Sequence, residues 1–275
     1  MTAMPAPVET VLRRRFAGHE WQPTQHGNRV GAAVHRLAGG TDLYVKWSPC
    51  TAAPDPGISP CAEAERLAWL ARQGIGCPEV VDTGTVDEHE YLVTTAAPGV
   101  PANRARPAGD LFAVCDAIAD FAADLHRLPV ADCPFDRRLR VRVPQAHEAA
   151  ALGDIDLADV SPPWRGRTVV GLLTELVTAA RRVGREEPVV CHGEYCLPNI
   201  LIDPDTWTVS AIVDVGRLGV ADRYTDLALI TRSMTTGLHP QYGRDHADRF
   251  MYRYGELPAD GDRITLYRLL DEFCC

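Results

Sequence analysis

The sequence contains a single lysine, Lys46, although lysine and arginine together make up 28 of its 275 residues. Such a composition is typical of a GC-rich genome, in which arginine replaces lysine wherever arginine serves. The lysine that remains is expected where a compact ammonium is needed and a planar guanidinium does not fit. Survival by chance is the alternative.

Long apolar runs are also missing. No stretch approaches the roughly 18 apolar residues of a membrane-spanning helix, and the first residues, MTAMPAPVETVLRRRF, lack the apolar core of a signal peptide. The 9 cysteines are odd in number, scattered and without a CxxC pair, which argues against a disulfide framework and against a zinc site. We therefore expect a cytoplasmic protein with reduced thiols.

Positive charge is in the minority, and the formal net charge is −9. This balance disfavours nucleic acid and anionic membranes as partners and favours a cationic small molecule. A purely solubilising role of the charge is the alternative. The length allows either one large core or two modest lobes.

The first third of the chain reads as strands with one helix. Residues 21–40 predict a hairpin, residues 42–47 a strand that carries Lys46, and residues 77–99 two further strands. The helix is expected at residues 61–75, with Ala64, Leu67, Leu70 and Ala71 on its apolar face.

Beyond about residue 108 the pattern becomes helical. Ile118, Phe121, Leu125 and Leu128 follow helical spacing within residues 110–129, which indicates a core helix. Further helices are expected at residues 169–184, 225–234 and 263–273. We therefore predict an α+β chain with a β-rich nucleotide-binding lobe at residues 1–98 and a mainly helical catalytic and substrate-binding lobe at residues 99–275.

Polar residues at the ends of short apolar strands suggest phosphoryl transfer. Glu194 and Asn199 have the spacing of a catalytic loop in which a carboxylate accepts the substrate proton and an amide oxygen binds a metal ion. Asp214 follows the next apolar run and offers the hard oxygen ligand that Mg²⁺ prefers. Lys46 would pair with nucleotide phosphates, and Glu63 on the next helix would hold the ammonium. Each feature alone is weak, and their order along the chain makes them significant together.

The chain resembles the aminoglycoside O-phosphotransferases, most closely the 3′-hydroxyl class. The resemblance is carried by HGEYCLPNILID, IVDVGRLGVADRYTDLAL, VADCPFDRRL, LYVKW, AEAERLAWL and the terminal LLDEF, so it covers nearly the whole chain. It implies a bilobal protein-kinase-like fold that binds ATP and Mg²⁺ between its lobes and phosphorylates an aminoglycoside.

The resemblance also implies roles for individual residues. Glu194 takes the position of the catalytic base, Asn199 and Asp214 those of the magnesium ligands, and Lys46 with Glu63 that of the phosphate clamp. The nucleotide would further contact Tyr44 by stacking, backbone groups near Thr94 and Ala96, and a loop containing Gly27 and Gly31. The antibiotic pocket would be lined or supported by Asp156, Asp159, Arg217, Arg232, Asp271 and Glu272.

Four positions depart from the family pattern. Glu194 replaces an aspartate, and a longer nucleotide loop carries Arg29. Ser161, Pro162 and Pro163 stand where the family has consecutive acids, and Ser233 stands where it has an aspartate. The last two changes remove carboxylates expected to meet substrate ammonium groups. They favour a narrow substrate range or a role in biosynthesis.

We therefore expect an ATP-dependent kinase of an aminoglycoside hydroxyl, most simply the 3′-OH, in self-resistance or biosynthesis. One alternative is a kinase of another cationic antibiotic, streptomycin-like or a basic cyclic peptide. The other is a catalytically silent kinase-like ligand-binding protein, which only Glu194 favours. The oligomeric state stays open.

Overall fold

The computed structural model describes residues 4–27, 33–50, 54–104, 111–158 and 160–273. The chain divides into two compact units, Met1–Ala97 and Pro98–Cys274, which we call the N-terminal and C-terminal lobes. Across the described part of the chain, no helix is long and apolar enough to cross a bilayer.

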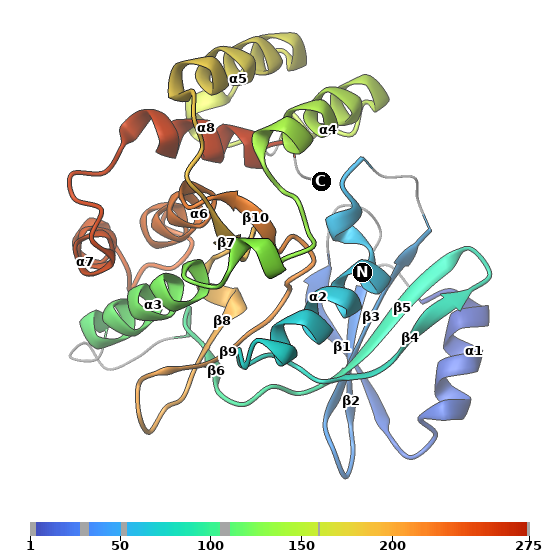
Figure 1. The fold of residues 1–275 in the computed structure, drawn as a ribbon. Coiled ribbons are helices and arrows are strands. Elements are labelled where there is room, and N and C mark those ends of the chain that lie inside the picture. Colours follow the sequence, from blue (N-terminus) through green and yellow to red (C-terminus); the bar gives the residue numbers. More distant parts are fainter. Residues whose placement is uncertain (1–3, 28–32, 51–53, 105–110, 159, 274–275) are drawn as a thin grey trace. The chain divides into compact units, whose positions relative to one another are not determined.

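The N-terminal lobe is built on an antiparallel sheet of five strands in the order β1-β2-β3-β5-β4 (Figure 1). The lobe contains α1 as well as the expected α2, so the prediction of one helix in this region was wrong. Only Val8 and Leu12 of α1 are buried, which leaves too few apolar positions for a clear helical pattern. The elements are α1 Ala6–Arg15, β1 Glu20–Gly27, β2 Ala33–Ala38, β3 Leu43–Pro49, α2 Pro60–Arg72, β4 Val80–Val86 and β5 His89–Thr95.

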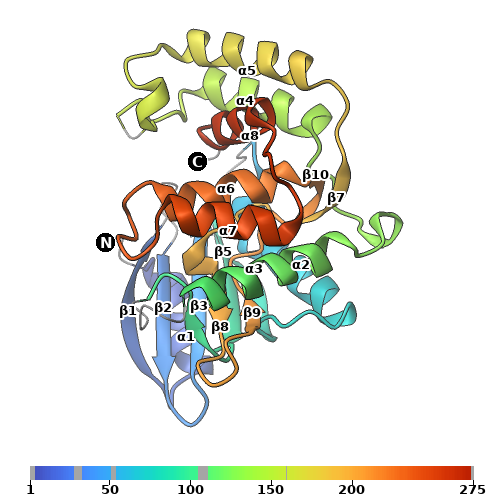
Figure 2. The same cartoon turned by 90° about the vertical axis from the view of Figure 1, so that its left-hand side faces the viewer.

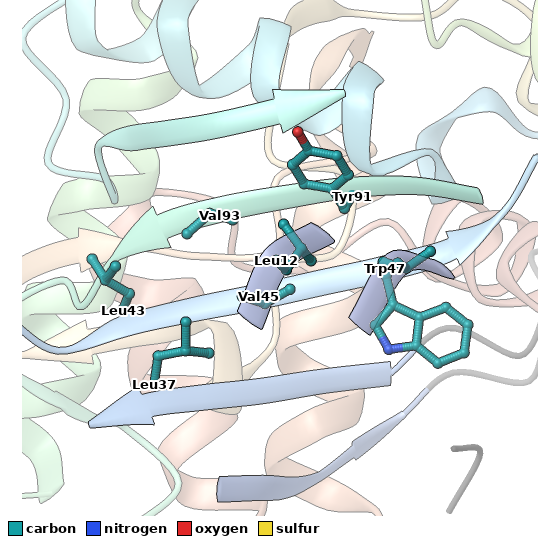
Figure 3. Close-up of a cluster of buried hydrophobic side chains, with 8 residues drawn as sticks. Leu12, Leu37, Leu43, Val45, Trp47, Tyr91 and Val93 are labelled. Carbon is teal, nitrogen blue, oxygen red and sulfur yellow. The ribbon is translucent and has the colours of Figure 1, made fainter. Parts of the chain in front are cut away.

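One face of this sheet forms the core of the N-terminal lobe. Leu12 of α1 packs in a buried cluster with residues of β2, β3 and β5 (Figure 3). Because side chains alternate along a strand, Val45 and Trp47 of β3 belong to this core. Tyr44 and Lys46 therefore lie on the opposite face of the sheet. The buried cluster consists of Val8, Leu12, Leu37, Leu43, Val45, Trp47, Tyr91 and Val93.

The helix α2 packs against β4 and β5. Leu67 and Leu70 are buried as expected, and Trp69 is buried as well. Ala71, which the helical pattern assigned to the apolar face, is exposed. It lies in the last turn of the helix, which ends at Arg72.

The C-terminal lobe combines six helices, α3 to α8, with two small sheets in its described residues. β7 pairs with β10, and β6, β8 and β9 form the second sheet. The expected α+β class, with a β-rich first lobe and a mainly helical second lobe, is confirmed. The elements are β6 Val100–Pro101, α3 Leu111–His126, α4 Leu139–Leu152, α5 Val169–Val183, β7 Pro188–Cys191, β8 Ile200–Ile202, β9 Val209–Ile212, β10 Gly219–Asp222, α6 Tyr224–Thr235, α7 Arg244–Tyr254 and α8 Gly261–Asp271.

Within this lobe α3 packs against α7, and α6 packs against both α7 and α8 (Figure 2). Ile118 and Leu125 of α3 are fully buried as the spacing indicated, whereas Phe121 and Leu128 are only half-buried. The sequence pattern did not indicate α4 or α7. Pro144 lies inside α4 and interrupts its pattern, and α7 is rich in charged residues.

Candidate active site

Lys46 and Glu63 form an ion pair within the N-terminal lobe. Lys46 lies in the middle of β3 and Glu63 in the first turn of α2. The Nζ atom of Lys46 donates a hydrogen bond of 2.7 Å to Oε2 of Glu63. The two side chains are 19% and 7% exposed, so solvent screens this pair less than it screens a surface pair. The structure thus brings the lone lysine and its expected partner together.

The residues expected to meet adenine lie close to this pair in the sheet. Tyr44 shares the sheet face of Lys46 and stands directly opposite Thr94 of β5. Ala96 follows β5, and its amide donates a hydrogen bond of 2.9 Å to the carbonyl of Asp42. This bond occupies the amide, which leaves the carbonyl of Ala96 as the group that an adenine amino group could meet.

The expected phosphate-binding loop is described only at its start. Gly27 ends β1 and pairs with Ala33 of β2. Arg29 and Gly31 lie outside the described residues, so their contact with phosphate stays a prediction.

In the C-terminal lobe, the candidate catalytic loop, residues 192–199 and called the catalytic loop below, leaves β7 and is held by Asp226 of α6. Asp226 is fully buried. Its Oδ2 accepts the amide of His192 at 2.7 Å, and its Oδ1 accepts the amide of Gly193 at 2.9 Å. His126 of α3 contacts Oδ2 through Nε2 at 3.1 Å. Because hydrogen bonds to a charged group are stronger than neutral ones, α6 fixes the point at which the loop leaves the strand.

Gly193 permits the path of the loop. Its φ is +84°, a region that residues with a side chain rarely adopt. A Cβ atom at this position would lie 2.1 Å from the backbone carbonyl oxygen of Arg217. The catalytic loop and the backbone at Arg217 are therefore in close contact.

His192 links the catalytic loop to the segment that precedes Asp214. Its Nδ1 accepts the amide of Glu194 at 3.1 Å, and its Nε2 lies 3.1 Å from the carbonyl oxygen of Val213. A carbonyl oxygen only accepts, so Nε2 carries the proton and the ring is neutral. Burial lowers the pKa of His192 below its ordinary value, against the opposing effects of Asp226 and Asp214.

Glu194, Asn199 and Asp214 are brought together by two further hydrogen bonds. The Nδ2 of Asn199 donates to the carbonyl of Glu194 at 3.1 Å, and the amide of Val213 donates to the carbonyl of Asn199 at 3.0 Å. Asp214 follows directly, with a φ of +57°. Aspartate tolerates this left-handed conformation better than most residues do.

The donor set fits a magnesium ion. Because the side-chain nitrogen of Asn199 is bonded to the loop, the side-chain oxygen is the atom it can offer to a metal. Asp214 adds a carboxylate, and hard oxygen atoms are the ligands that Mg²⁺ prefers. Among the described residues, a different group of three possible metal ligands lies close together, namely His126, Cys191 and Asp226. Its members are buried, and Asp226 is already engaged by the catalytic loop.

Four charged residues form a series of ion pairs that leads from Glu194 to the end of α8. Arg217 lies 3.3 Å from Oε2 of Glu194 and 3.9 Å from Oδ1 of Asp271. Arg232 of α6 lies 2.5 Å from Oδ2 of Asp271 and 3.7 Å from Oε1 of Glu272. Arg217 and Asp271 also border a narrow pocket whose other walls include two more arginines, Arg137 and Arg142.

Other expected pocket residues lie in the segment after α4. Asp156 is exposed, and its carboxylate accepts the amide of Ala158 at 2.9 Å. Asp159 lies outside the described residues. The amide of Ser161 donates to Oε2 of Glu272 at 3.1 Å, which ties this segment to the end of α8.

Ser233 has a role that the sequence did not indicate. It is buried, and its hydroxyl accepts the amide of Leu197 at 3.2 Å. The side chain therefore supports the catalytic loop from α6. Asp226 also lacked a predicted role, although a carboxylate directly before the apolar run at residues 227–230 was an available signal.

Comparison with known proteins places this site in a family. The model of the phosphotransferase enzyme family matches residues 25–259. An aminoglycoside 3′-phosphotransferase of Streptomyces fradiae is 43% identical over 269 residues, which cover 96% of this chain and 99% of that protein.

Similar solved structures are also aminoglycoside phosphotransferases. The structure of an aminoglycoside 3′-phosphotransferase of type VIII is similar with a TM-score of 0.87 and 40% identity, covering 96% of this chain and 97% of the other. An aminoglycoside phosphotransferase from Streptomyces rimosus, APH(3″)-Id in complex with ADP and streptomycin, has a TM-score of 0.80 and 32% identity, covering 99% and 100%. The protein-kinase-like fold is therefore confirmed, and the chain belongs to the phosphotransferase enzyme family.

Proposed function

We propose that this phosphotransferase uses ATP and Mg²⁺ to phosphorylate a hydroxyl group of an aminoglycoside, namely the 3′-OH. The observation that carries the proposal is the catalytic loop. Glu194 and Asn199 are joined by a hydrogen bond, and the backbone of Asn199 is bonded to Val213, next to Asp214. This arrangement supports the proposal that Glu194 acts as the proton acceptor and that Asn199 and Asp214 act as the two oxygen ligands.

Each of these residues would have a separate role in phosphoryl transfer. Lys46, oriented by Glu63, would hold the nucleotide phosphates. Glu194 would orient the substrate hydroxyl and accept its proton, which is expected to contribute about 10² to 10⁴ in rate. Asn199 and Asp214 would hold Mg²⁺, which when bound neutralises charge on the transferred phosphoryl group. We also propose that the protein works in the cytoplasm, where ATP is available.

A cationic substrate is supported by the acidic end of α8. Glu272 is 9% exposed, and its Oε1 has no hydrogen-bond partner among the described residues. Arg232 lies 3.7 Å from this oxygen. A buried acceptor without a donor is costly, and a substrate ammonium would supply that donor. The 43% identity to an aminoglycoside 3′-phosphotransferase supports the choice of substrate.

A second candidate is a kinase of a streptomycin-like antibiotic. It is favoured by the similarity to the streptomycin-bound APH(3″)-Id. The pairing of Arg232 with both Asp271 and Glu272 also reduces the charge available to a polyamine. Self-resistance and a step of aminoglycoside biosynthesis are both consistent with this chemistry.

The test is ADP release by the purified protein with MgATP and matched substrates. One pair consists of an aminoglycoside with a 3′-OH and its 3′-deoxy analogue, and streptomycin is the third arm. We expect turnover of the first compound alone, with the phosphate placed on O3′ by ³¹P–¹H NMR. Turnover of streptomycin alone would establish the second candidate. A protein that binds ATP and releases no ADP with any arm would be a silent ligand-binding relative.

A further inference from the structure

Five side chains of alternating charge connect the catalytic loop to the end of α8. Their order is Glu194, Arg217, Asp271, Arg232 and Glu272, and each neighbouring pair lies within 4 Å: 3.3, 3.9, 2.5 and 3.7 Å. The first member is the proposed base, and the acidic members at the other end are the proposed contacts of the substrate ammonium groups. We call this set the charge chain.

Two interior members of the charge chain, Arg217 and Asp271, are largely shielded from solvent. The side chain of Arg217 is 12% exposed and that of Asp271 is 18% exposed, so their interactions are screened far less than those of a surface ion pair. The backbone of Arg217 is fixed as well, because its carbonyl oxygen abuts Gly193 of the catalytic loop. A guanidinium held in this way can act as a fixed reference point for the carboxylate that it contacts.

Arg217 is shared unequally between two carboxylates. It makes a hydrogen bond with Glu194 at 3.3 Å and only a loose ion pair with Asp271 at 3.9 Å. Asp271 has a closer partner in Arg232, at 2.5 Å. An ammonium group that arrives at Asp271 would therefore weaken the Arg217–Asp271 contact first, and Arg217 would then pair more fully with Glu194.

We propose that Arg217 is a positioning residue that orients the Glu194 carboxylate and couples this orientation to the binding of a cationic substrate at Asp271. The proposal rests on the proposed function. Arg217 holds Oε2 of Glu194, and Oε1 takes the proton of the substrate hydroxyl. The pairing also suits a glutamate at this position, because an aspartate is shorter by one methylene and ends farther from Arg217.

A double-mutant cycle tests this role. Arg217→Gln is expected to lower kcat at least tenfold in the parent, and by no more than about threefold in the Glu194→Asp background, because coupled residues are not additive. Arg217→Lys keeps one charged donor and is expected to restore part of the lost kcat. Arg253→Gln removes an arginine that pairs with Asp120 on the surface, and it serves as the matched control with unchanged kcat.

The outcomes separate positioning from other roles. An equal loss of kcat in both backgrounds would overturn the proposal, because it would show that Arg217 acts independently of Glu194. A loss confined to the KM of the aminoglycoside would also overturn it, because it would describe a residue that only contacts the substrate. If the parent turns over no aminoglycoside, the proposed function fails, and the same four proteins are compared by urea unfolding. Non-additive unfolding free energies would then support the Glu194–Arg217 coupling, and additive ones would refute it.

Discussion

Glu194 is one methylene longer than the aspartate of the family pattern. At this length its carboxylate accepts a hydrogen bond from Arg217. Glu194→Gln keeps the size of the side chain but removes the charge and the proton acceptor. We expect kcat to fall by about 10² to 10⁴ with little change in ATP affinity. Steady-state kinetics with isothermal titration of the nucleotide measures both quantities.

Glu194→Asp is the matched comparison, and it should remain active because the carboxylate is retained. A Gln variant as fast as the parent would mean that Glu194 is only a loop residue. A parent that is dead and an Asp variant that is active would mean that activity was lost through the single methylene.

At the scale of elements, the catalytic loop depends on the buried carboxylate of Asp226 in α6. Asp226→Ala leaves the amides of His192 and Gly193 without their acceptors. Since a buried unpaired donor costs roughly 1–3 kcal/mol, we expect the free energy of unfolding to fall by about 2–4 kcal/mol in urea titrations. Asp116→Ala, which breaks a pair with Arg249, is the control and should cost below about 1 kcal/mol. Equal losses in the two variants would contradict the assignment.

The same loop makes stability depend on pH through His192. Its pKa in the folded protein is lowered, so the folded state resists protonation while the unfolded state takes up a proton near pH 6.5. The free energy of unfolding therefore carries the full contribution of neutral His192 above about pH 6.5. This contribution is lost as the pH falls toward the folded pKa, at up to about 1.4 kcal/mol per pH unit. Protonation would also break the bond from the Glu194 amide to Nδ1.

Urea unfolding between pH 7 and pH 5.5 measures this dependence. His192→Asn retains a donor and an acceptor but does not titrate, so its slope against pH should be smaller than that of the parent. Identical slopes would show that other groups cause the acid sensitivity.

Sequence reasoning reached those elements whose local pattern and tertiary packing agree. The strand of Lys46, the helix of Glu63 and the helix at residues 110–129 have regular apolar spacing, and the fold class followed from them. The helices α1, α4 and α7 were missed, because α1 buries only two residues, Pro144 interrupts α4 and charged residues dominate α7.

The candidate site divides in a similar way. Residues that we propose to take part in the chemistry are recognisable by type and spacing, as with Glu194 and Asn199. Supporting residues such as Asp226 and Ser233 are not, because their function lies in contacts with a loop more than 30 residues away in sequence, which only the fold creates. The ion pairs of Arg232 with Asp271 and Glu272 likewise could be identified only from the structure.

At the scale of the whole molecule, the net charge of −9 should assist the encounter with a polycationic substrate. Because salt screens exposed charges, we expect the KM of the aminoglycoside to rise at least about threefold between low salt and roughly 0.5 M salt. The KM of ATP, an anion, should rise less. Initial rates at several salt concentrations measure both constants, and a salt-independent KM of the aminoglycoside would rule out steering by net charge.

The lone lysine also makes the protein a chemically simple target. Lys46 is 19% exposed, sits on β3 in contact with Glu63, and is the one lysine in these 275 residues. An amine-directed reagent delivered by a nucleotide analogue would therefore meet a single lysine side chain. A covalent inhibitor of this design would leave one modified peptide in a digest, and the occupancy of the proposed nucleotide site could be read directly by mass spectrometry.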